Sequence, residues 1–290
     1  MTLEELLKEG IRQLMEEQAP EAKLDAQMLL QEAFGLDMVH FLMNRRKPLE
    51  ESQTVQEAME VYKEMIQKRC KRIPLQYILG TQEFMGLTFE VNGHVLIPRQ
   101  DTETLVETVL EEQKDKNKKV LDLCTGSGCI AVSLAALGGY KEVTATDLSQ
   151  EALKVAKRNA NRLLEENYLC LRQGDLFHAL LPGETYDILT CNPPYIPTEI
   201  IKELQPEVKN YEPFMALDGH GDGLEFYRQI ADQARDWLNP SGWIYLEIGY
   251  DQANAVSSLL EKAGFDNIKV IKDAPGLDRV VCGESIIRKR

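Results

Sequence analysis

Apolar side chains in the first seventy residues recur every three or four positions, the spacing of amphipathic helices. Three runs show this pattern, over residues 3–15, 24–33 and 52–72; a proline and a glycine end the first two, and Ser52 can act as the N-cap of the third. This part holds no carboxylate pair and no His–Cys cluster. We therefore expect residues 1–72 to form a small helical bundle that serves in packing or partner recognition.

The pattern changes to short strands and glycine-containing turns between residues 73 and 98. Asn92-Gly93 separates the strand-like stretch Phe89-Glu90-Val91 from Val95-Leu96-Ile97, and Pro98 follows. Asn-Gly is the favoured sequence for a two-residue hairpin turn. The pattern predicts that residues 73–98 form a β-hairpin linker with its turn at Asn92-Gly93.

Apolar strands alternate with amphipathic helices from about residue 119 onward. This alternation is typical of parallel strands joined by crossover helices, so we expect residues 99–290 to form a doubly wound, Rossmann-like α/β domain with seven strands. The last two strands are joined only by residues 273–279, which is too short for a parallel crossover, so they should pair antiparallel at the edge of the sheet. The expected strands are 120–124, 143–147, 168–173, 186–191, 243–248, 267–272 and 280–287, and the expected helices are 129–137, 150–165, 223–237 and 251–262.

A glycine-rich turn, Cys124-Thr125-Gly126-Ser127-Gly128, connects the first of these strands to the first helix. Glycines here permit a tight turn and close approach of a ligand to the backbone. Asp147 ends the next strand, about twenty residues further on, where a carboxylate can accept hydrogen bonds from both ribose hydroxyls of an adenosine. Because the spacing from Gly126 to Ala131 also fits a dinucleotide, the loop alone leaves S-adenosylmethionine and a nicotinamide cofactor equally open.

Two further features favour S-adenosylmethionine over a dinucleotide. Asp122 precedes the glycine loop, where its carboxylate could orient the loop or meet the cationic end of a ligand. The antiparallel final hairpin also differs from the usual sheet of six parallel strands in dinucleotide-binding enzymes.

The tetrapeptide Asn192-Pro193-Pro194-Tyr195 follows the strand 186–191, at the sheet edge where open α/β folds bind ligands. An amide nitrogen is a poor nucleophile, so it must be held firmly. The Asn192 side-chain oxygen can accept one N–H of a substrate NH₂ group and the Pro193 carbonyl the other. The prolines stiffen the chain, and Tyr195 offers an aromatic face to a planar group. These four residues predict a methyltransferase that acts on an amide or amino nitrogen, because hydride transfer has no use for them.

Motifs spread over nearly the whole chain carry a more specific resemblance. They are Pro74-Leu-Gln-Tyr-Ile-Leu-Gly80, Glu83-Phe84, Val95-Leu-Ile-Pro-Arg99, Asp101-Thr-Glu103, Leu121-Asp-Leu-Cys-Thr-Gly-Ser-Gly128, Asn192-Pro-Pro-Tyr-Ile196, Tyr211-Glu-Pro213, Asp222-Gly-Leu224 and Leu246-Glu-Ile-Gly249. Together they resemble the bacterial release-factor glutamine methyltransferases.

This resemblance implies N5-methylation of the glutamine in the Gly-Gly-Gln motif of class 1 peptide chain release factors, with the helical bundle helping to hold the release factor. It implies that Asn192 to Tyr195 contact the glutamine. The residues it implies for contact with S-adenosylmethionine are Cys124, Thr125, Gly126, Ser127, Gly128, Asp147, Asp175, Leu176 and Asn192. Two positions depart from the family, which commonly has glycine in place of Cys124 and in some members an aromatic residue in place of Leu176.

The net charge of −14 bears on the choice of substrate. Proteins that hold nucleic acid usually present a basic surface, because neutralisation of phosphates supplies most of their affinity. A polypeptide substrate therefore fits better, and we expect no direct nucleic-acid partner. The alternatives are a DNA or RNA amino-methyltransferase acting on an exocyclic base nitrogen and a non-catalytic binding module that retains the fold; the intact tetrapeptide and Asp147 speak against the latter.

Composition points to a cytoplasmic, monomeric protein without metal. No apolar stretch is long enough for a membrane span, and no signal peptide is expected because Glu4 and Glu5 stand near the start of the chain, where a signal peptide is basic. The six scattered cysteines indicate free thiols in a reducing compartment, with Cys191 buried and inert. The four dispersed histidines lack ligand spacing, so we expect no metal site.

Two segments near the expected site have no assigned chemistry. Arg99 and Glu103 stand at a helix start, where they form either a surface ion pair or part of the closure of the site. The glycine-dense segment 218–223 is expected to be a mobile connection near the site.

Overall fold

The computed structural model describes residues 1–165 and 168–286, which fall into two compact units. The helical unit contains Met1–Gly80 together with Gln205–Tyr211, and the sheet unit contains Thr81–Leu204 and the chain from Glu212 onward. The chain thus leaves the sheet unit after Leu204 and re-enters it at Glu212.

The helical unit contains the three predicted helices and three short ones that the periodicity missed. Its elements are α1 (Leu3–Glu16), α2 (Ala22–Phe34), α3 (Met38–Asn44), α4 (Gln53–Cys70), α5 (Leu75–Leu79) and α10 (Pro206–Tyr211). Helix α4 begins after Ser52, whose side chain accepts from the Val55 N–H at 3.3 Å as an N-cap, and Gly35 ends α2 with a left-handed backbone. Helices α3 and α5 are too short for an apolar period to be recognised.

A buried ion network joins α10 to the rest of the helical unit. Arg69 Nε contacts Asp25 Oδ2 at 2.6 Å, and Arg69 Nη2 contacts Glu207 Oε1 at 2.8 Å. Arg72 donates to both oxygens of Glu207 at 2.7 Å. Residues 205–211 therefore belong to the helical unit through charged groups that would be costly to leave unpaired.

The hairpin lies in the predicted segment, but its turn was predicted at the wrong place. Strands β1 (Thr81–Phe84) and β2 (Leu87–Glu90) pair antiparallel, and the two-residue turn is Met85-Gly86, with φ of +53° and +72°. Positive φ at both positions is the pattern of a type I′ turn. Asn92-Gly93 forms a separate turn without a following strand, because Val95 and its neighbours pack as buried side chains instead of pairing.

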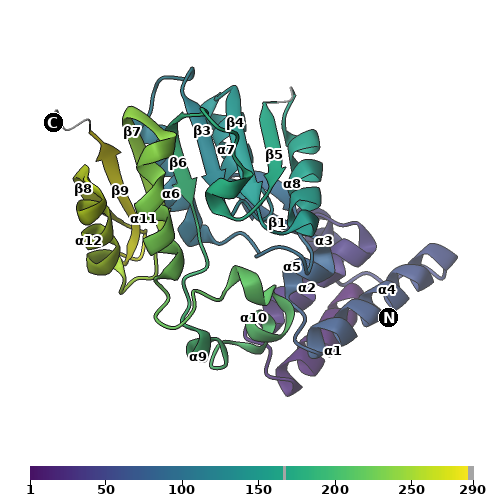
Figure 1. Ribbon diagram of the computed structural model, residues 1–290. Coiled ribbons are helices and arrows are strands. Elements are labelled where there is room, and N and C mark those ends of the chain that lie inside the picture. The colour runs from purple at the N-terminus through teal and green to yellow at the C-terminus, as the bar shows by residue number, and fades with distance from the viewer. Residues whose placement is uncertain (166–167, 287–290) are drawn as a thin grey trace. The chain divides into compact units, whose positions relative to one another are not determined.

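The sheet unit is built on a seven-stranded sheet, as predicted, with the strand order β5-β4-β3-β6-β7-β9-β8 (Figure 1). The first five strands in this order are parallel, and β9 pairs antiparallel with both β7 and β8. Strand β8 forms one edge of the sheet. The last residue of the predicted strand 280–287, residue 287, lies outside the described residues. The strands are β3 (Lys119–Leu123), β4 (Glu142–Asp147), β5 (Leu169–Gln173), β6 (Tyr186–Cys191), β7 (Leu238–Glu247), β8 (Phe265–Lys272) and β9 (Asp278–Ser285).

Helices cover both faces of this sheet. Two separate apolar clusters form because neighbouring strand residues point to opposite faces: Val120 packs with α6, α7 and α8, whereas Leu121 packs with α11 and α12. The helices are α6 (Gln100–Glu112), α7 (Cys129–Gly138), α8 (Gln150–Leu163), α9 (Thr198–Ile201), α11 (Glu225–Trp237) and α12 (Ala253–Ala263), with short 3₁₀ turns at Leu176–Ala179 and Phe214–Ala216. Helix α6 was not predicted beyond its start.

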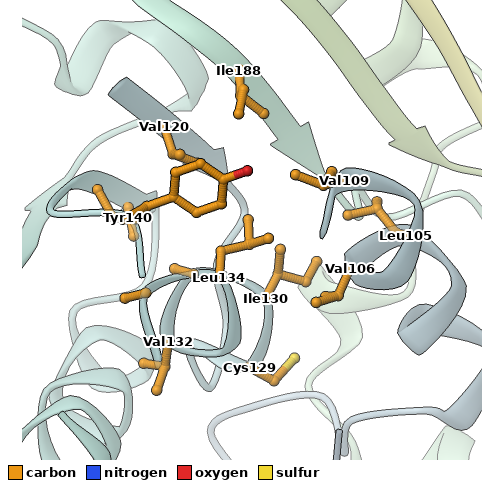
Figure 2. Packing of buried hydrophobic residues seen from close by; sticks show 14 of the residues in the cluster. Leu105, Val106, Val109, Val120, Cys129, Ile130, Val132, Leu134, Tyr140 and Ile188 are labelled. Carbon is orange, nitrogen blue, oxygen red and sulfur yellow. The ribbon is translucent and has the colours of Figure 1, made fainter. Parts of the chain in front are cut away.

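Figure 2 shows the first cluster, in which the Tyr140 ring points toward Val120 and Leu134. The Tyr140 hydroxyl donates to the Gln113 carbonyl, so the buried ring has a partner for its polar end. This packing fixes α7 beneath the sheet and with it the glycine loop at the start of the helix. Within residues 1–165 and 168–286, no helix has the length and apolarity needed to cross a membrane.

Candidate active site

A cavity of about 330 Å³ lies at the carboxyl ends of β3, β4 and β6. This volume is in the usual range for small-molecule sites, about 300–1,000 Å³. The predicted site residues that line the cavity are Cys124, Thr125, Gly126, Ser127, Asp147, Asp175, Leu176, Asn192 and Pro194. The predicted residues Gly128, Pro193 and Tyr195 are not among the residues that line it.

The glycine loop has a left-handed backbone at three positions. Cys124, Gly126 and Gly128 have φ of +56°, +55° and +81°. This conformation favours glycine, so the cysteine there is strained by about 1–2 kcal/mol. The Cys124 side chain nevertheless lines the cavity.

The two glycines of the loop serve different purposes. A Cβ added at Gly126 would meet no atom within 4 Å, so the backbone there is open to a ligand. A Cβ added at Gly128 would lie 3.1 Å from the Ala156 Cβ. Gly128 thus permits α7 to approach α8, whereas Gly126 permits the chain to approach whatever fills the cavity.

Asp147 links β4 to the glycine loop. Its Oδ2 accepts from the Gly126 N–H and its Oδ1 from the Ser149 N–H, both at 2.8 Å. Burial raises the pKa of Asp147, and these two hydrogen bonds oppose that rise. Because each carboxylate oxygen can accept more than one hydrogen bond, Asp147 can still receive hydroxyl groups from the cavity.

Asp122 lies beneath the loop and does not line the cavity. Its carboxyl is fully buried and accepts from the hydroxyls of Thr125 at 2.6 Å and Thr190 at 2.7 Å. Burial raises the pKa of Asp122 to about 7. These contacts join the loop to β6, so Asp122 orients the loop and does not meet a ligand.

Asn192 stands at the end of β6, within the cavity wall. Its Nδ2 donates to Thr102 Oγ1 at 3.3 Å. Since the amide NH₂ is directed toward Thr102, the Oδ1 atom is left to accept a hydrogen bond from a substrate. Thr102 belongs to α6, so this hydrogen bond connects the tetrapeptide to an element other than the strand β6 that precedes it.

Tyr195 is held at both its side chain and its backbone. Its hydroxyl donates to Glu247 Oε1 at 3.4 Å, and its carbonyl accepts from Gln252 Nε2 at 3.0 Å. Burial raises the pKa of the Tyr195 hydroxyl. Glu247 lies at the end of β7, next to β6, so both ends of the tetrapeptide are attached to neighbouring elements of the sheet unit.

Arg99 and Glu103 do not pair with each other, so the predicted surface ion pair is wrong. Arg99 pairs with Glu212, and Glu103 accepts from the Met85 N–H at 2.6 Å in the hairpin turn. Burial raises the pKa of Glu212, and the Arg99 charge opposes that rise. The residues after Glu212, from Pro213 to Ala216, line the cavity, so this ion pair fixes one wall.

The segment 218–223 lies against the chain that follows the tetrapeptide. Ile196 and Asp218 form a parallel bridge, and Thr198 Oγ1 donates to Asp218 Oδ1 at 2.6 Å. Asp218 and His220 line the cavity. The segment therefore forms part of the cavity wall, which its glycine content alone did not indicate.

Nucleophilic and metal chemistry find no support in the described part of the chain. Cys191 is fully buried, and burial raises the pKa of its thiol, which disfavours the reactive thiolate. Within residues 1–165 and 168–286, no group of three or more His, Cys, Asp or Glu side chains is placed to hold a metal ion.

The sequence reasoning overlooked Thr102 and Glu247, the residues behind the tetrapeptide. Thr102 was noted only within the motif Asp101-Thr-Glu103, because α6 was not predicted beyond its start. Glu247 was noted only within the motif Leu246-Glu-Ile-Gly249; a carboxylate in the last position of an apolar strand was the signal that could have identified it, as it did Asp147.

Two family models match the chain: the PrmC N-terminal domain over residues 5–80 and the methyltransferase small domain over residues 100–204. The release factor glutamine methyltransferase of Geobacter sulfurreducens is 43% identical, with 93% of this chain and 92% of that protein covered. The protein of the same name from Clostridium acetobutylicum is also 43% identical, with 89% of each chain covered. Among solved structures, the hMettl16 catalytic domain bound to an RNA hairpin has a TM-score of 0.57 and 20% identity, covering 78% of this chain and 83% of its own, and shares the fold.

Proposed function

The chain belongs to the release factor glutamine methyltransferases, and we propose that it transfers a methyl group from S-adenosylmethionine to the side-chain amide nitrogen of a glutamine in a peptide chain release factor. The target is the N5 atom of the glutamine in the Gly-Gly-Gln motif of class 1 factors. The observation that carries this proposal is the hydrogen bond from Asn192 Nδ2 to Thr102, which leaves Oδ1 to accept from an amide NH₂ beside the glycine loop.

The cavity suits an adenosyl group at several points. Asp147 offers two carboxylate oxygens to the ribose hydroxyls, and the open backbone at Gly126 admits close approach. Thr146 lines the cavity, and its buried hydroxyl has no hydrogen-bond partner among the described residues. Leu176 lines the cavity next to Asp175 and would offer an aliphatic surface to the adenine.

S-adenosylmethionine supplies a methyl carbon made electrophilic by its sulfonium. Asn192 Oδ1 accepts one N–H of the substrate amide, and the carbonyl of Pro193, which follows Asn192 but does not itself line the cavity, would accept the other. Two acceptors fix the NH₂ group and direct the nitrogen lone pair at the methyl carbon. The nitrogen bonds to that carbon as the carbon–sulfur bond breaks, and then loses a proton to water. No strong base is required, because the methylated nitrogen is acidic before it loses that proton.

The helical unit recognises the release factor in this proposal. Its helices contain no residues of the cavity, and its core is a separate apolar cluster. A protein substrate also accords with the net charge of −14, which disfavours nucleic acid. We propose that the enzyme acts as a cytoplasmic monomer.

Transfer of a labelled methyl group tests the proposal. The chain is incubated with labelled S-adenosylmethionine and, in separate reactions, with release factor, RNA or DNA. We expect label on the release factor alone and its loss in Asn192→Ala, while the exposed-residue control Asn117→Ala keeps the wild-type rate. Label on nucleic acid alone would establish the alternative, an amino-methyltransferase acting on bases.

A further inference from the structure

Glu247 is a buried carboxyl group behind the substrate-binding tetrapeptide, and the proposed methyl transfer does not use it directly. It is the last residue of β7, and its side chain is 1% exposed. Its Oε1 accepts from the Tyr195 hydroxyl, and the Thr102 hydroxyl interacts with the same carboxyl and lowers its pKa. Thr102 in turn accepts from Asn192. Glu247 therefore connects to both ends of the tetrapeptide.

The protonation of these groups determines which way the hydrogen bonds run. An ionised carboxylate can only accept, so the Thr102 hydroxyl must donate its single hydrogen to Glu247. The Thr102 oxygen then offers only lone pairs to Asn192 and must receive the amide NH₂. Without the carboxylate, Thr102 could donate to the Asn192 oxygen, and the amide would present its NH₂ group to the substrate.

We propose that Glu247 is a positioning residue that sets the direction of the hydrogen bonds from Glu247 through Thr102 to Asn192. This inference rests on the proposed function. Glu247 turns the Asn192 amide so that Oδ1 faces the substrate NH₂, and it orients Tyr195 through the hydroxyl. Glu247 does not touch the substrate. Its effect passes through Thr102 and Tyr195.

The local structure argues against a role in stability alone. Glu247 Oε2 has no aligned donor among the described residues, and a buried, unpaired oxygen is destabilising. Arg279, whose charge opposes the rise in the pKa of Glu247, forms ion pairs with Asp101 and Asp273, each at 3.2 Å. A glutamine would fill the same volume at lower desolvation cost, so a carboxyl group here needs a reason other than packing.

Other ionisable groups surround Glu247. Those whose charge or hydrogen bonding reaches it are Tyr195, Arg279 of β9, Asp101 of α6, Tyr227 of α11 and Cys129 of α7. Burial raises the pKa of Glu247 to about 7, while Thr102 and Arg279 oppose the rise. The group therefore becomes an acceptor at both oxygens, with no hydrogen to donate, only as the pH rises through neutrality.

The test compares Glu247→Gln with wild type in methyl transfer to the release factor. Glutamine carries an NH₂ group and cannot force Thr102 to donate. We expect kcat to fall by about ten- to a hundredfold, the size of effect seen when a preorganised polar contact is lost. The KM for release factor and the Kd for S-adenosylmethionine should stay within about twofold, and Tm should be unchanged or higher.

Two further measurements separate positioning from a general structural effect. The wild-type kcat should decline below about pH 7, the pKa of Glu247, and this decline should be absent in Glu247→Gln. Thr102→Val removes the hydroxyl between the two residues, so the double variant Thr102→Val/Glu247→Gln should be no slower than the slower single variant. The conservative variant Thr102→Ser keeps the hydroxyl and should recover most of the rate lost in Thr102→Val.

Three outcomes would overturn the inference. The first is a wild-type kcat in Glu247→Gln. The second is a loss explained by lower Tm or weaker binding of S-adenosylmethionine, and the third is additive losses in the double variant. Each leaves the proposed function intact as long as wild type labels the release factor. If wild type transfers no label to the release factor, the proposed function fails and the inference fails with it.

Discussion

Cys124 adopts a left-handed backbone conformation that is more favourable for glycine than for cysteine. Its φ of +56° lies in the left-handed region, and its side chain borders the cavity. A cysteine tolerates this because it is small and unbranched at Cβ, whereas a β-branched residue is disfavoured at positive φ.

Substitution at this position should follow backbone strain. Cys124→Gly should leave stability within about 1 kcal/mol of wild type, because relief of strain and the greater flexibility of glycine offset each other. Cys124→Val, close in volume but branched, should lower Tm by several degrees. Thermal unfolding of the two variants provides the check, and equal Tm values would show that the loop is not strained at this position.

Most of the residues that line the cavity and were predicted for the site could be found from the sequence alone. Residues 124–127 of the glycine loop, Asp147 and Asn192 line one cavity because all lie at the carboxyl ends of parallel strands, a rule that needs no coordinates. Thr102 and Glu247 could not be derived in the same way. Their importance comes from hydrogen bonds between elements distant in sequence, which no local pattern encodes.

At the scale of elements, the glycine loop depends on how closely α7 approaches α8. The contact between Gly128 and Ala156 has no room for a side chain, whereas Gly126 faces open space. Both glycines have positive φ, so they share the strain that any L-residue would suffer there.

The two glycines therefore form a matched pair for mutation. Gly126→Ala should lower stability by about 1 kcal/mol, from backbone strain alone. Gly128→Ala adds overpacking against α8 and should lose about 1–3 kcal/mol more. Denaturant unfolding of both variants measures the difference, and a larger loss in Gly126→Ala would contradict the account of the loop.

The hairpin illustrates where element prediction fails. Asn92-Gly93 is the stronger turn signal in the sequence, yet the chain makes its type I′ turn at Met85-Gly86. Two tertiary contacts favour that choice: Glu103 accepts from the Met85 N–H, and Asn159 Oδ1 accepts from the Glu90 N–H. Strand alternation in the sheet was predicted correctly because its long apolar runs leave no competing arrangement.

On the scale of the whole molecule, several buried carboxyl groups have raised pKa values. Asp122 and Glu247 are raised to about 7, and burial also raises the pKa of Asp147 and Glu212. The folded state therefore holds more protons than the unfolded state between the unfolded pKa, about 4, and about 7. These four groups make stability fall as the pH rises through this interval.

Thermal unfolding across pH checks this linkage. We expect Tm to decline between about pH 5 and pH 8 and to decline less in Glu247→Gln, which has one ionisable group fewer. The difference in Tm between the variant and wild type should therefore grow with pH. A wild-type Tm that rises over the same interval would mean that the surface ion pairs outweigh these buried groups.

Within the helical unit, Glu207 joins α10 to the other helices. Glu207→Ala removes the partner of Arg72 and one partner of Arg69, so stability should fall by about 3–5 kcal/mol if both guanidinium groups stay buried. The exposed pair Lys202–Glu199 supplies the control, since Glu199→Ala should change stability by less than about 1 kcal/mol. Similar losses in the two variants, measured by denaturant unfolding, would show that the buried network contributes little.

The most direct test of the central claim is to locate the transferred methyl group by mass spectrometry of the digested release factor. The account predicts one methyl group, on the side-chain amide of the glutamine in the Gly-Gly-Gln motif, and none when that glutamine is replaced by glutamate, which has the same shape but no NH₂ group for Asn192 to hold. A methyl group on any other residue, or undiminished transfer to the glutamate form, would contradict it.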